Sequence, residues 1–238
     1  RQLSAVGAGN PFKLMQQNGL QTAFLSESRR QKTTELKEAV KSLAAGKGEL
    51  ALDFLSSRSH FEADEHKRLR QIAKEYAGID ASTRQKTLVL AGRRDHRKAI
   101  TSEIRKILQR QGELGDNSPI QIFRQKNLTA AEIRAGIGMK NDDFLVTAKG
   151  LLMPVSEASS QKRVLSKGNT ILEAGKLEVA IGDKLVWTRN CRQTRFRNGQ
   201  EFTLVGKDSE HIVIHDRKGN DHRLSTKQPL YLDHGYVS

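Results

Sequence analysis

The stretch "TLVLAGRRDHRKAITSEIRKIL", residues 87–108, decides the fold class of this 238-residue chain. Its first six residues form a short apolar run of the kind that is typical of a buried strand. Helical spacing follows, with Asp95 at the position expected for a cap. The apolar face of that helix would consist of Ile100, Ile104, Ile107 and Leu108. A strand followed directly by a helix is half of a parallel α/β unit, so we expect an α/β protein.

Two more helices are predicted before this stretch. Residues 33–46, "TTELKEAVKSLAAG", begin with Thr33 or Thr34 as a cap and end at Gly46. The face predicted to be apolar consists of Leu36, Val40, Leu43 and Ala44. Residues 62–78 form the second helix, which is acidic at its start, as the helix dipole favours.

From Gly112 onward the sequence becomes rich in turns and in short β-type runs. One short helix is expected at the capping-box pattern "TAAE", residues 129–132. Turn signals occur at "NG", residues 198–199, and "RKGND", residues 217–221. The candidate strands lie at 144–148, 151–155, 176–180, 184–188, 201–205 and 211–216. Short strands with tight turns favour a small barrel or sandwich that is inserted in, or appended to, the α/β part.

The chain is strongly basic, with 41 Lys and Arg against 27 Asp and Glu and a net charge of +14. Residues 84–110 hold nine basic and two acidic residues, which gives +7, and residues 161–197 hold nine and three, which gives +6. Polyanions are therefore the expected partners. No apolar run reaches the ~20 residues that a membrane span needs, so no membrane insertion is expected.

The densest positive charge lies in "TRNCRQTRFRNGQ", residues 188–200, directly after the single tryptophan, Trp187. Its arginines are Arg189, Arg192, Arg195 and Arg197. Arginines that contact phosphates, with Trp187 and Phe196 as stacking faces, are the components of a groove for single-stranded DNA. Alternatively, Trp187 belongs to the core and the arginines form a solvated strand edge.

The helix within "AGRRDHRKAITSEIRK", residues 91–106, raises the same choice, because Arg97, Lys98, Arg105 and Lys106 lie away from its apolar stripe. They form either a solvated face or a nucleic-acid contact. The lone Cys191 fits a free thiol in a reducing compartment. His211 and His215 would share a strand face, but without a third ligand we expect a surface pair and no metal site. The sequence contains no phosphate-binding loop and no complete catalytic site.

Four segments together resemble motifs of RecD-like superfamily 1 DNA helicases. They are "RQLSAVGAGNPF" at 1–12, "LSESRRQ" at 25–31, "GDKLVWTRNCRQTRFRNGQEFTLV" at 182–205 and "YLDHGYVS" at 231–238. Their order matches that family, and the basic insertion is most similar to the conjugative relaxase-helicases of F-like plasmids. The chain opens with Arg1 in the middle of the first motif, so it is expected to be a fragment of a larger protein.

The resemblance implies a RecA-like 2A subdomain that carries an inserted β-barrel, the 2B subdomain. Residues 1–113 would begin 2A, residues 114–224 would form 2B, and residues 225–238 would return to 2A. Gln2 and Arg30 would contact nucleotide, because a guanidinium at the position of Arg30 stabilises charge on a transferring phosphoryl group. ATP and Mg²⁺ would be cofactors of the parent protein. The fragment lacks the other ATPase motifs, so alone it is expected to be inactive.

Proteins of this kind act in the bacterial cytoplasm and are transferred to the recipient cell through a type IV secretion system. The resemblance therefore implies a coupling protein as a second partner, which reads internal translocation signals. Residues 182–188, "GDKLVWT", resemble such a signal and also satisfy the helicase pattern. The candidate signal residues are Gly182, Asp183, Lys184, Leu185, Val186, Trp187 and Thr188.

Three hypotheses for function follow. The first is a relaxase-helicase fragment that binds single-stranded DNA and presents a translocation signal. In the second, the chain is a protein-recognition module, whose basic strip meets an acidic surface of the coupling protein. The third is half of an active ATP-dependent helicase motor, which closes an ATP site that another domain builds.

Overall fold

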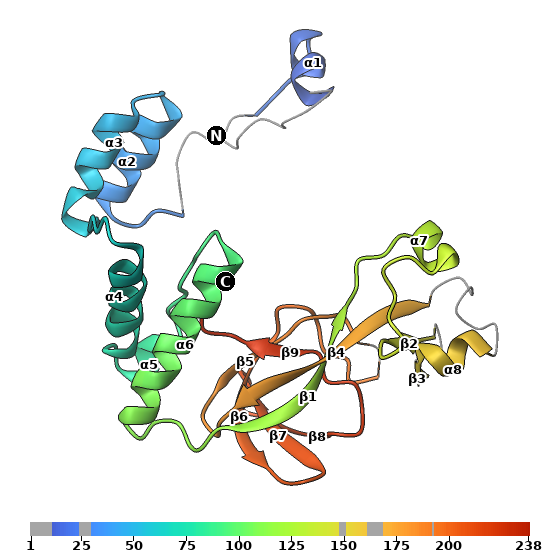
Figure 1. Cartoon of the computed structure of the whole chain (residues 1–238). Helices are drawn as coiled ribbons and strands as arrows, with labels where there is room; N and C mark the ends of the chain where they lie inside the picture. The colour runs from blue at the N-terminus through green and yellow to red at the C-terminus, as the bar shows by residue number, and fades with distance from the viewer. Residues whose placement is uncertain (1–10, 24–29, 148–150, 161–168, 192) are drawn as a thin grey trace. The chain divides into compact units, whose positions relative to one another are not determined.

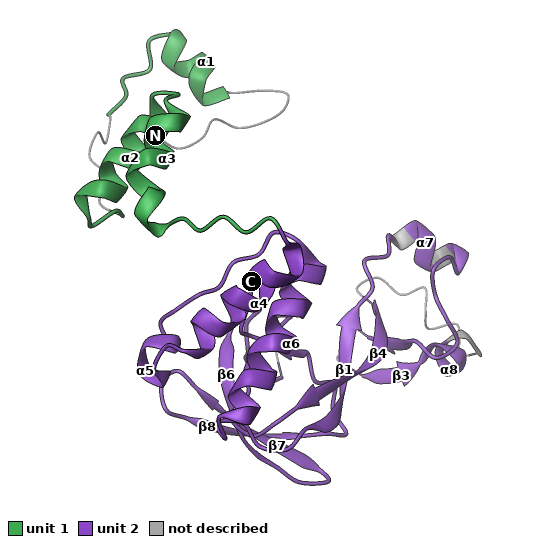
Figure 2. Ribbon diagram, turned by 60° about the vertical axis from the view of Figure 1, so that its left-hand side comes forward, with its two compact units in different colours: residues 1–63 green, residues 64–238 purple. Residues whose placement is uncertain are grey.

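The computed structural model describes residues 11–23, 30–147, 151–160, 169–191 and 193–238. The chain divides into two compact units, residues 1–63 and residues 64–238 (Figure 2). The predicted subdomain boundaries after residues 113 and 224 both fall inside the second unit, and they stay predictions.

The first unit is helical. It contains α1 (Pro11–Gln17), α2 (Thr34–Ala44), α3 (Gly48–Leu55) and the 3-10 turn η1 (Ser56–Arg58). The predicted cap of α2 is confirmed, because the Thr33 hydroxyl accepts a hydrogen bond from the Leu36 N–H. The predicted apolar face is wrong in part. Small residues, Ala39, Ser42 and Ala51, are buried where α2 packs on α3, and the larger Val40 and Leu43 stay exposed.

Three helices begin the second unit: α4 (Glu65–Ala77), α5 (Ala81–Arg84) and α6 (Arg94–Arg110). The predicted helix at 62–78 is confirmed as α4, and α6 buries Ile100, Ile104 and Leu108 as its spacing predicts. Asp95 was wrongly assigned as the cap. The N-cap residue is Arg93, and Asp95 lies in the first turn, where its carboxylate pairs with the Arg93 guanidinium.

The predicted buried strand at 87–92 is much shorter than expected. Only Val89 forms a β-bridge, parallel to Val237, and the Ala91 N–H donates to the Ser238 carbonyl oxygen at 2.9 Å. Val89 packs against the core between α4 and α6, whereas Leu88 and Leu90, which alternate with it, are exposed. The run is therefore half-buried, because only one of its faces has a neighbour within the described residues.

The rest of the second unit forms two antiparallel sheets (Figure 1). The first has the order β1 (Ser118–Gln125), β4 (Thr170–Val179), β2 (Phe144–Val146) and β3 (Leu152–Pro154), with α7 (Ala130–Ala135) and α8 (Val155–Ser160) in its connections. The second has the order β8 (Asp221–Ser225), β7 (His211–Asp216), β6 (Glu201–Lys207), β5 (Lys184–Trp187) and β9 (Leu232–His234).

All six predicted strands are found, with 176–180 as the end of the longer β4, but β1, β8 and β9 had not been predicted. The capping box at Thr129 and Glu132 is confirmed. So is the turn at 217–221, where Gly219 adopts a φ of 91° between β7 and β8. The α/β class is confirmed in its coarse sense of a mixed α/β protein. The closed barrel is not, because the described strands form two open sheets around one shared core.

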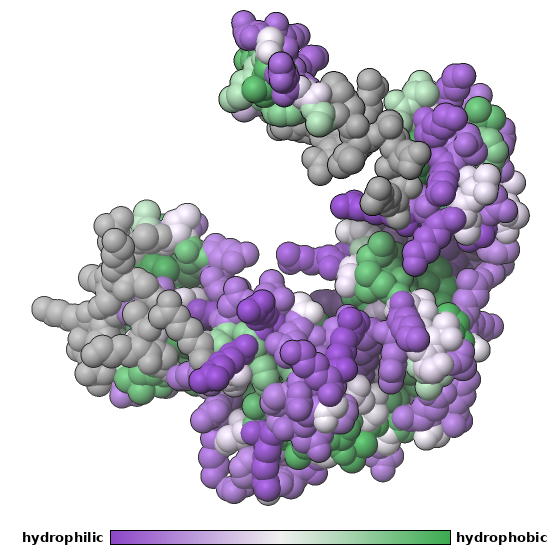
Figure 3. All heavy atoms as spheres, turned by 180° about the vertical axis from the view of Figure 1, so that it is seen from behind, coloured by the Kyte–Doolittle hydropathy of each residue, from purple (hydrophilic) through white to green (hydrophobic). Residues whose placement is uncertain are grey.

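The face of the molecule in Figure 3 is mainly hydrophilic, with hydrophobic atoms in smaller patches. None of the helices in the described part of the chain combines the length and the hydrophobicity that a membrane span requires. A hydrophilic surface alone does not show which basic residues of the second unit are free to bind a ligand.

Candidate nucleic-acid interface

A buried ion pair joins the helical part of the second unit to strand β5. The Asp183 carboxylate is fully buried and accepts two hydrogen bonds from Arg105 of α6, both at 2.9 Å. It also accepts from the Ala180 N–H at 2.6 Å and from the Tyr236 hydroxyl at 2.9 Å. Such a charge is tolerated in a core because both of its oxygens are paired.

Tyr236 extends this network to the end of the chain. Burial, and the neighbouring Asp183 carboxylate, raise the pKa of Tyr236, so its hydroxyl keeps the proton that it donates. The same oxygen accepts a hydrogen bond from the Lys184 N–H at 3.2 Å. Burial is also the main reason why the pKa of His234 is lowered. Arg105 is therefore a structural residue, and its assignment to a solvated or DNA-binding face of α6 is wrong.

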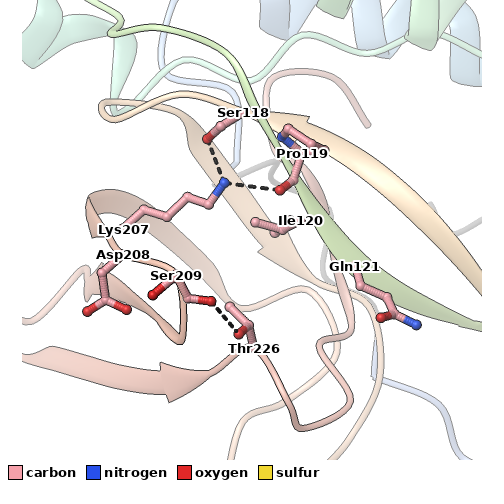
Figure 4. Close-up of a pocket in the computed structure, with 8 residues that line it drawn as sticks. All are labelled: Ser118, Pro119, Ile120, Gln121, Lys207, Asp208, Ser209 and Thr226. Carbon is pink, nitrogen blue, oxygen red and sulfur yellow. Dashed lines mark hydrogen bonds between the residues drawn. The ribbon is translucent and has the colours of Figure 1, made fainter.

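Lysine 207 fixes the start of β1 to the end of β6. Its Nζ donates to the Ser118 hydroxyl at 2.6 Å and to the Pro119 carbonyl oxygen at 3.0 Å, as Figure 4 shows. The side chains around it, which include Asp208 and Thr226, line an open depression of ≈ 460 Å³. Through these hydrogen bonds, Lys207 links the two sheets.

Replacing Lys207 with methionine is expected to lower the free energy of unfolding by about 1–2 kcal/mol, because two charge-assisted hydrogen bonds are lost at a partly exposed site. Urea unfolding followed by the fluorescence of Trp187, the single tryptophan, measures the change. Lys218→Met, at an exposed turn position, is the matched control and should leave the midpoint unchanged. Equal unfolding midpoints for both variants would contradict the stabilising link that Lys207 forms between the two sheets.

Trp187 belongs to the core, as the alternative interpretation of this residue held. Its side chain is fully buried. The ring packs edge-to-face against Phe196, with centroids 5.1 Å apart, and against Tyr231, at 5.7 Å. Because no face of the indole is open, Trp187 cannot serve as a platform for an unpaired base.

Phe196 is also buried, with 5% of its surface exposed. Besides Trp187, its ring meets Phe202 at 4.7 Å and His222 at 5.0 Å. The prediction that Phe196 offers a stacking platform is therefore wrong. Phe196 lies among arginines in the sequence, but its side chain points into the core, because its apolar ring is removed from water there and packs against other aromatic rings.

Hydrogen bonds hold residues 188–200, which we name the arginine loop, in place. The Gly199 N–H donates to the Trp187 carbonyl oxygen at 2.7 Å, and the Trp187 N–H donates to the Gln200 carbonyl oxygen at 2.8 Å. Within the loop, the Asn198 N–H donates to Asn190 Oδ1 at 2.9 Å. Gly199 has a φ of 81°, as its turn signal predicts. The described residues of the loop are thus held by these hydrogen bonds and by the buried Phe196, in a connection longer than the tight hairpin that "NG" indicated.

The four predicted DNA-contacting arginines differ in their surroundings. Arg195 and Arg197 are exposed, on either side of the inward-facing Phe196. Arg189 is half-buried, donates to the Thr170 hydroxyl at 3.2 Å and lies over the Tyr231 ring at 5.4 Å. Arg192 lies outside the described residues. Of the three arginines that the structure describes, Arg195 and Arg197 are therefore free to meet a ligand from solvent.

The candidate translocation signal, residues 182–188, is an interior part of the sheet. Strand β5 pairs with β6 on one side and with β9 on the other. Asp183, Leu185 and Trp187 are buried, and Lys184 pairs with Glu201 at 3.1 Å. Gly182 is required by the fold, since its φ is 96° and a Cβ would lie 2.6 Å from the Glu113 carbonyl oxygen. Of the segment, Thr188 is exposed, and Gly182, Lys184 and Val186 reach the surface in part.

The nucleotide-contact candidates lie in the first unit. Arg30 is described and exposed, whereas Gln2 lies outside the described residues. Across the described residues, no group of His, Cys, Asp or Glu side chains could hold a metal ion. His211 and His215 each face a carboxylate, Asp208 at 3.6 Å and Asp221 at 2.8 Å, as expected for a surface pair.

Comparison with known proteins gives three findings. A family model described as an AAA domain matches residues 1–66. The Multifunctional conjugation protein TraI of Escherichia coli is 20% identical over 275 residues, covering 90% of this chain and 16% of its own length. TraI of Escherichia coli strain K12 is 21% identical over 280 residues, with the same coverage. The chain thus spans about one-sixth of these relatives.

Solved structures of Pif1 helicases also match. Pif1 from Bacteroides in complex with ADP-AlF3 and single-stranded DNA has a TM-score of 0.40 and 9% identity, covering 90% of this chain and 41% of that one. Two coordinating Pif1 helicases at forked duplex DNA give 0.38 and 10%, with 89% and 38% covered. The sequence matches confirm the resemblance to the helicase region of conjugative relaxase-helicases.

Proposed function

We propose, on the premise of this similarity to a segment of the conjugation protein TraI, that the chain is a relaxase-helicase segment that binds single-stranded DNA through the arginine loop. The proposal depends on one observation: the side chains of Arg195 and Arg197 are exposed on either side of the buried Phe196, which holds the arginine loop against the core. The net charge of +14 supports a polyanion as the ligand. Sequence similarity to TraI over nine-tenths of the chain supports a parent protein that acts in conjugation.

The translocation-signal role is part of the same proposal, in a narrower form. Because alternate residues of β5 are buried and both of its edges are paired, a coupling protein could read residues 182–188 only as part of a folded surface. That surface would combine the exposed atoms of Lys184, Val186 and Thr188 with their neighbours on β6 and β9. The proposal therefore requires a folded chain for recognition.

DNA binding is tested by replacing Arg195 and Arg197 with alanine. Each lost phosphate contact should reduce the log–log salt slope by ~0.7 on a single strand, so the double variant should lose about 1.4. Fluorescence anisotropy with a labelled single-stranded oligonucleotide, titrated at several salt concentrations, measures the slope. Duplex DNA of the same length tests the preference for single strands.

Lys37 and Lys47 provide the matched control, because both are exposed and their replacement by alanine removes the same charge. That control variant should keep the wild-type slope. If the arginine variant also keeps it, or if wild-type affinity does not change with salt, the arginine loop is not a DNA contact.

A protein-recognition module remains the competing function for the basic strip. Capture of the coupling protein by the wild-type chain, and equally by Arg195→Ala/Arg197→Ala, would place the partner surface elsewhere on the chain. Loss of capture together with unchanged DNA binding would assign these arginines to the protein partner. Leu185→Asp, which disrupts β5, distinguishes a folded signal from a linear one. Capture of the coupling protein should be lost if the signal is folded and retained if it is linear.

A second candidate function is half of an ATP-dependent helicase motor. It is favoured by the AAA-domain match over residues 1–66, which includes Arg30 and Gln2. In that motor Arg30 would contact the γ-phosphate of ATP, with Mg²⁺ held by another domain. ATPase activity of the whole parent protein that is lost on Arg30→Ala, with nucleotide binding retained, would support it. A parent with no DNA-stimulated ATPase activity would exclude it.

A further inference from the structure

We propose that residues 87–91, which we name the edge segment, are a docking site for an extended, acidic segment of a partner protein, which adds a strand beside them. The inference does not depend on the proposed DNA binding, because it concerns residues outside the arginine loop. It follows from three features of the edge segment: its unpaired backbone edge, its two exposed leucines, and the positive charges at its ends.

One backbone edge of the edge segment is paired and the other is open. The Ser238 N–H donates to the Val89 carbonyl oxygen at 3.0 Å, and the Ala91 N–H donates to the Ser238 carbonyl oxygen at 2.9 Å. Backbone groups of successive residues in a strand point to opposite edges, so those of Leu88 and Leu90 point away from Ser238. Within the described residues, Leu88 and Leu90 take part in no backbone–backbone hydrogen bond. An open edge of this kind is a template for a further strand.

The two faces of the edge segment also differ. Val89 and Ala91 pack against the core between α4 and α6, together with Val237 near the end of the chain (Figure 2). Leu88 and Leu90 alternate with them and are 54% and 73% exposed. Parallel strands in proteins are nearly always covered on both faces. The face that carries the two leucines, which has no cover within the described residues, is therefore suited to pack against a partner.

The charges at the two ends of the edge segment specify the chemistry of that partner. Lys86 precedes Leu88 by two residues, which places it on the face of Leu88 and Leu90, and Arg94 begins α6. Both cations are exposed, and in the described part of the chain neither forms an ion pair. A second copy of the chain would bring residues 84–110, with their net charge of +7, close to themselves.

The partner that fits all three features is an extended protein segment. Its backbone would pair with the open edge, and apolar residues at alternate positions would cover Leu88 and Leu90. Acidic residues beside them would meet Lys86 and Arg94. Strand addition of this kind takes its affinity from main-chain hydrogen bonds and its specificity from the alternating side chains.

The first experiment uses a probe of this chemistry, a short labelled peptide in which valine alternates with glutamate. Fluorescence anisotropy should show saturable binding to the whole chain, and the same peptide with lysine in place of glutamate should bind at least about tenfold more weakly. Amide hydrogen exchange followed by NMR should show that the N–H groups of Leu88 and Leu90 become protected when the valine–glutamate peptide binds. Absence of binding, equal binding of the two peptides, or unprotected Leu88 and Leu90 amides in the complex would overturn the inference.

The second experiment replaces Leu88 and Leu90 with serine. Because both side chains are exposed, the double variant should fold like wild type, keep its DNA binding and bind the valine–glutamate peptide at least about tenfold more weakly. Leu43→Ser/Leu52→Ser is the matched control: it removes two similarly exposed leucines of the first unit and should keep the wild-type affinity for the peptide. Equal affinities of the two double variants would contradict the assigned site.

Analytical ultracentrifugation tests the second copy as an alternative occupant. The wild-type chain should sediment as a monomer, because the positive charges around the edge segment repel a second copy. A wild-type dimer that dissociates on Leu88→Ser/Leu90→Ser would overturn the inference, since the edge segment would then be an interface between copies of this chain.

Discussion

Replacing Asp183 with asparagine is expected to lower the free energy of unfolding of the second unit by about 3–5 kcal/mol, the usual cost of breaking a buried ion pair from one side. The substitution keeps the shape of the side chain but leaves Arg105, a residue that is 9% exposed, without a counter-charge. It also replaces one acceptor oxygen by a donor that faces other donors. Urea unfolding followed by Trp187 fluorescence measures the loss.

Asp233→Asn is the matched control, because Asp233 forms an exposed ion pair with Arg124 at 3.6 Å. Exposed pairs of this kind contribute about 0–1 kcal/mol, so the control should unfold close to wild type. A loss below about 1 kcal/mol for Asp183→Asn would mean that water or a rearranged partner compensates the buried guanidinium. The network around Asp183 would then not be what joins α6 to β5.

Trp187→Ala is expected to cost about 3–5 kcal/mol, since it removes a fully buried indole from the centre of the shared core. The same change should weaken DNA binding, because Phe196 loses its edge-to-face partner and the arginine loop loses its anchor. Unfolding is followed by far-UV circular dichroism, because the variant has no tryptophan. DNA binding is measured below the unfolding transition of the variant.

Two other variants serve as comparisons for Trp187→Ala. Leu90→Ala, at a side chain that is 73% exposed, should change stability by less than about 0.5 kcal/mol. Trp187→Phe keeps an aromatic partner for Phe196 and removes an indole Nε1 that has no hydrogen-bond partner within the described residues. It should therefore lose much less stability than Trp187→Ala and retain DNA binding. Normal DNA binding by a folded Trp187→Ala would show that the loop is held without the aromatic cluster.

The two buried features have a common consequence for function. The Asp183 network fixes the start of β5, and the aromatic cluster fixes its end, where the arginine loop begins. The helicase-like pattern at residues 182–205 therefore contains several residues that have structural roles in this chain. They are Gly182, the buried Asp183, the core strand β5 and the residues that hold the arginine loop in place. Among the described residues of this pattern, Arg195 and Arg197 are the exposed basic side chains that remain for an anionic ligand.

Local features were predictable from the sequence because they depend on neighbours in the chain. The Thr33 cap, the Thr129–Glu132 capping box and the turn around Gly219 each involve residues within a few positions of one another. The same holds for the apolar face of α6, whose spacing alone indicates burial. Net charge, and the similarity of the four motifs to helicases, likewise required no coordinates.

The sequence by itself thus determined the helices α2, α4, α6 and α7, most of the strands and the helicase resemblance, and it predicted a polyanion as the ligand. Only the tertiary structure decided which members of a basic or aromatic run face solvent. Arg105 and Lys106 are neighbours, yet Arg105 is buried because Asp183, 78 residues away, returns to meet it. Phe196 turned inward for the same reason: its partners on other strands supply the contact energy, and no local pattern encodes where those strands lie.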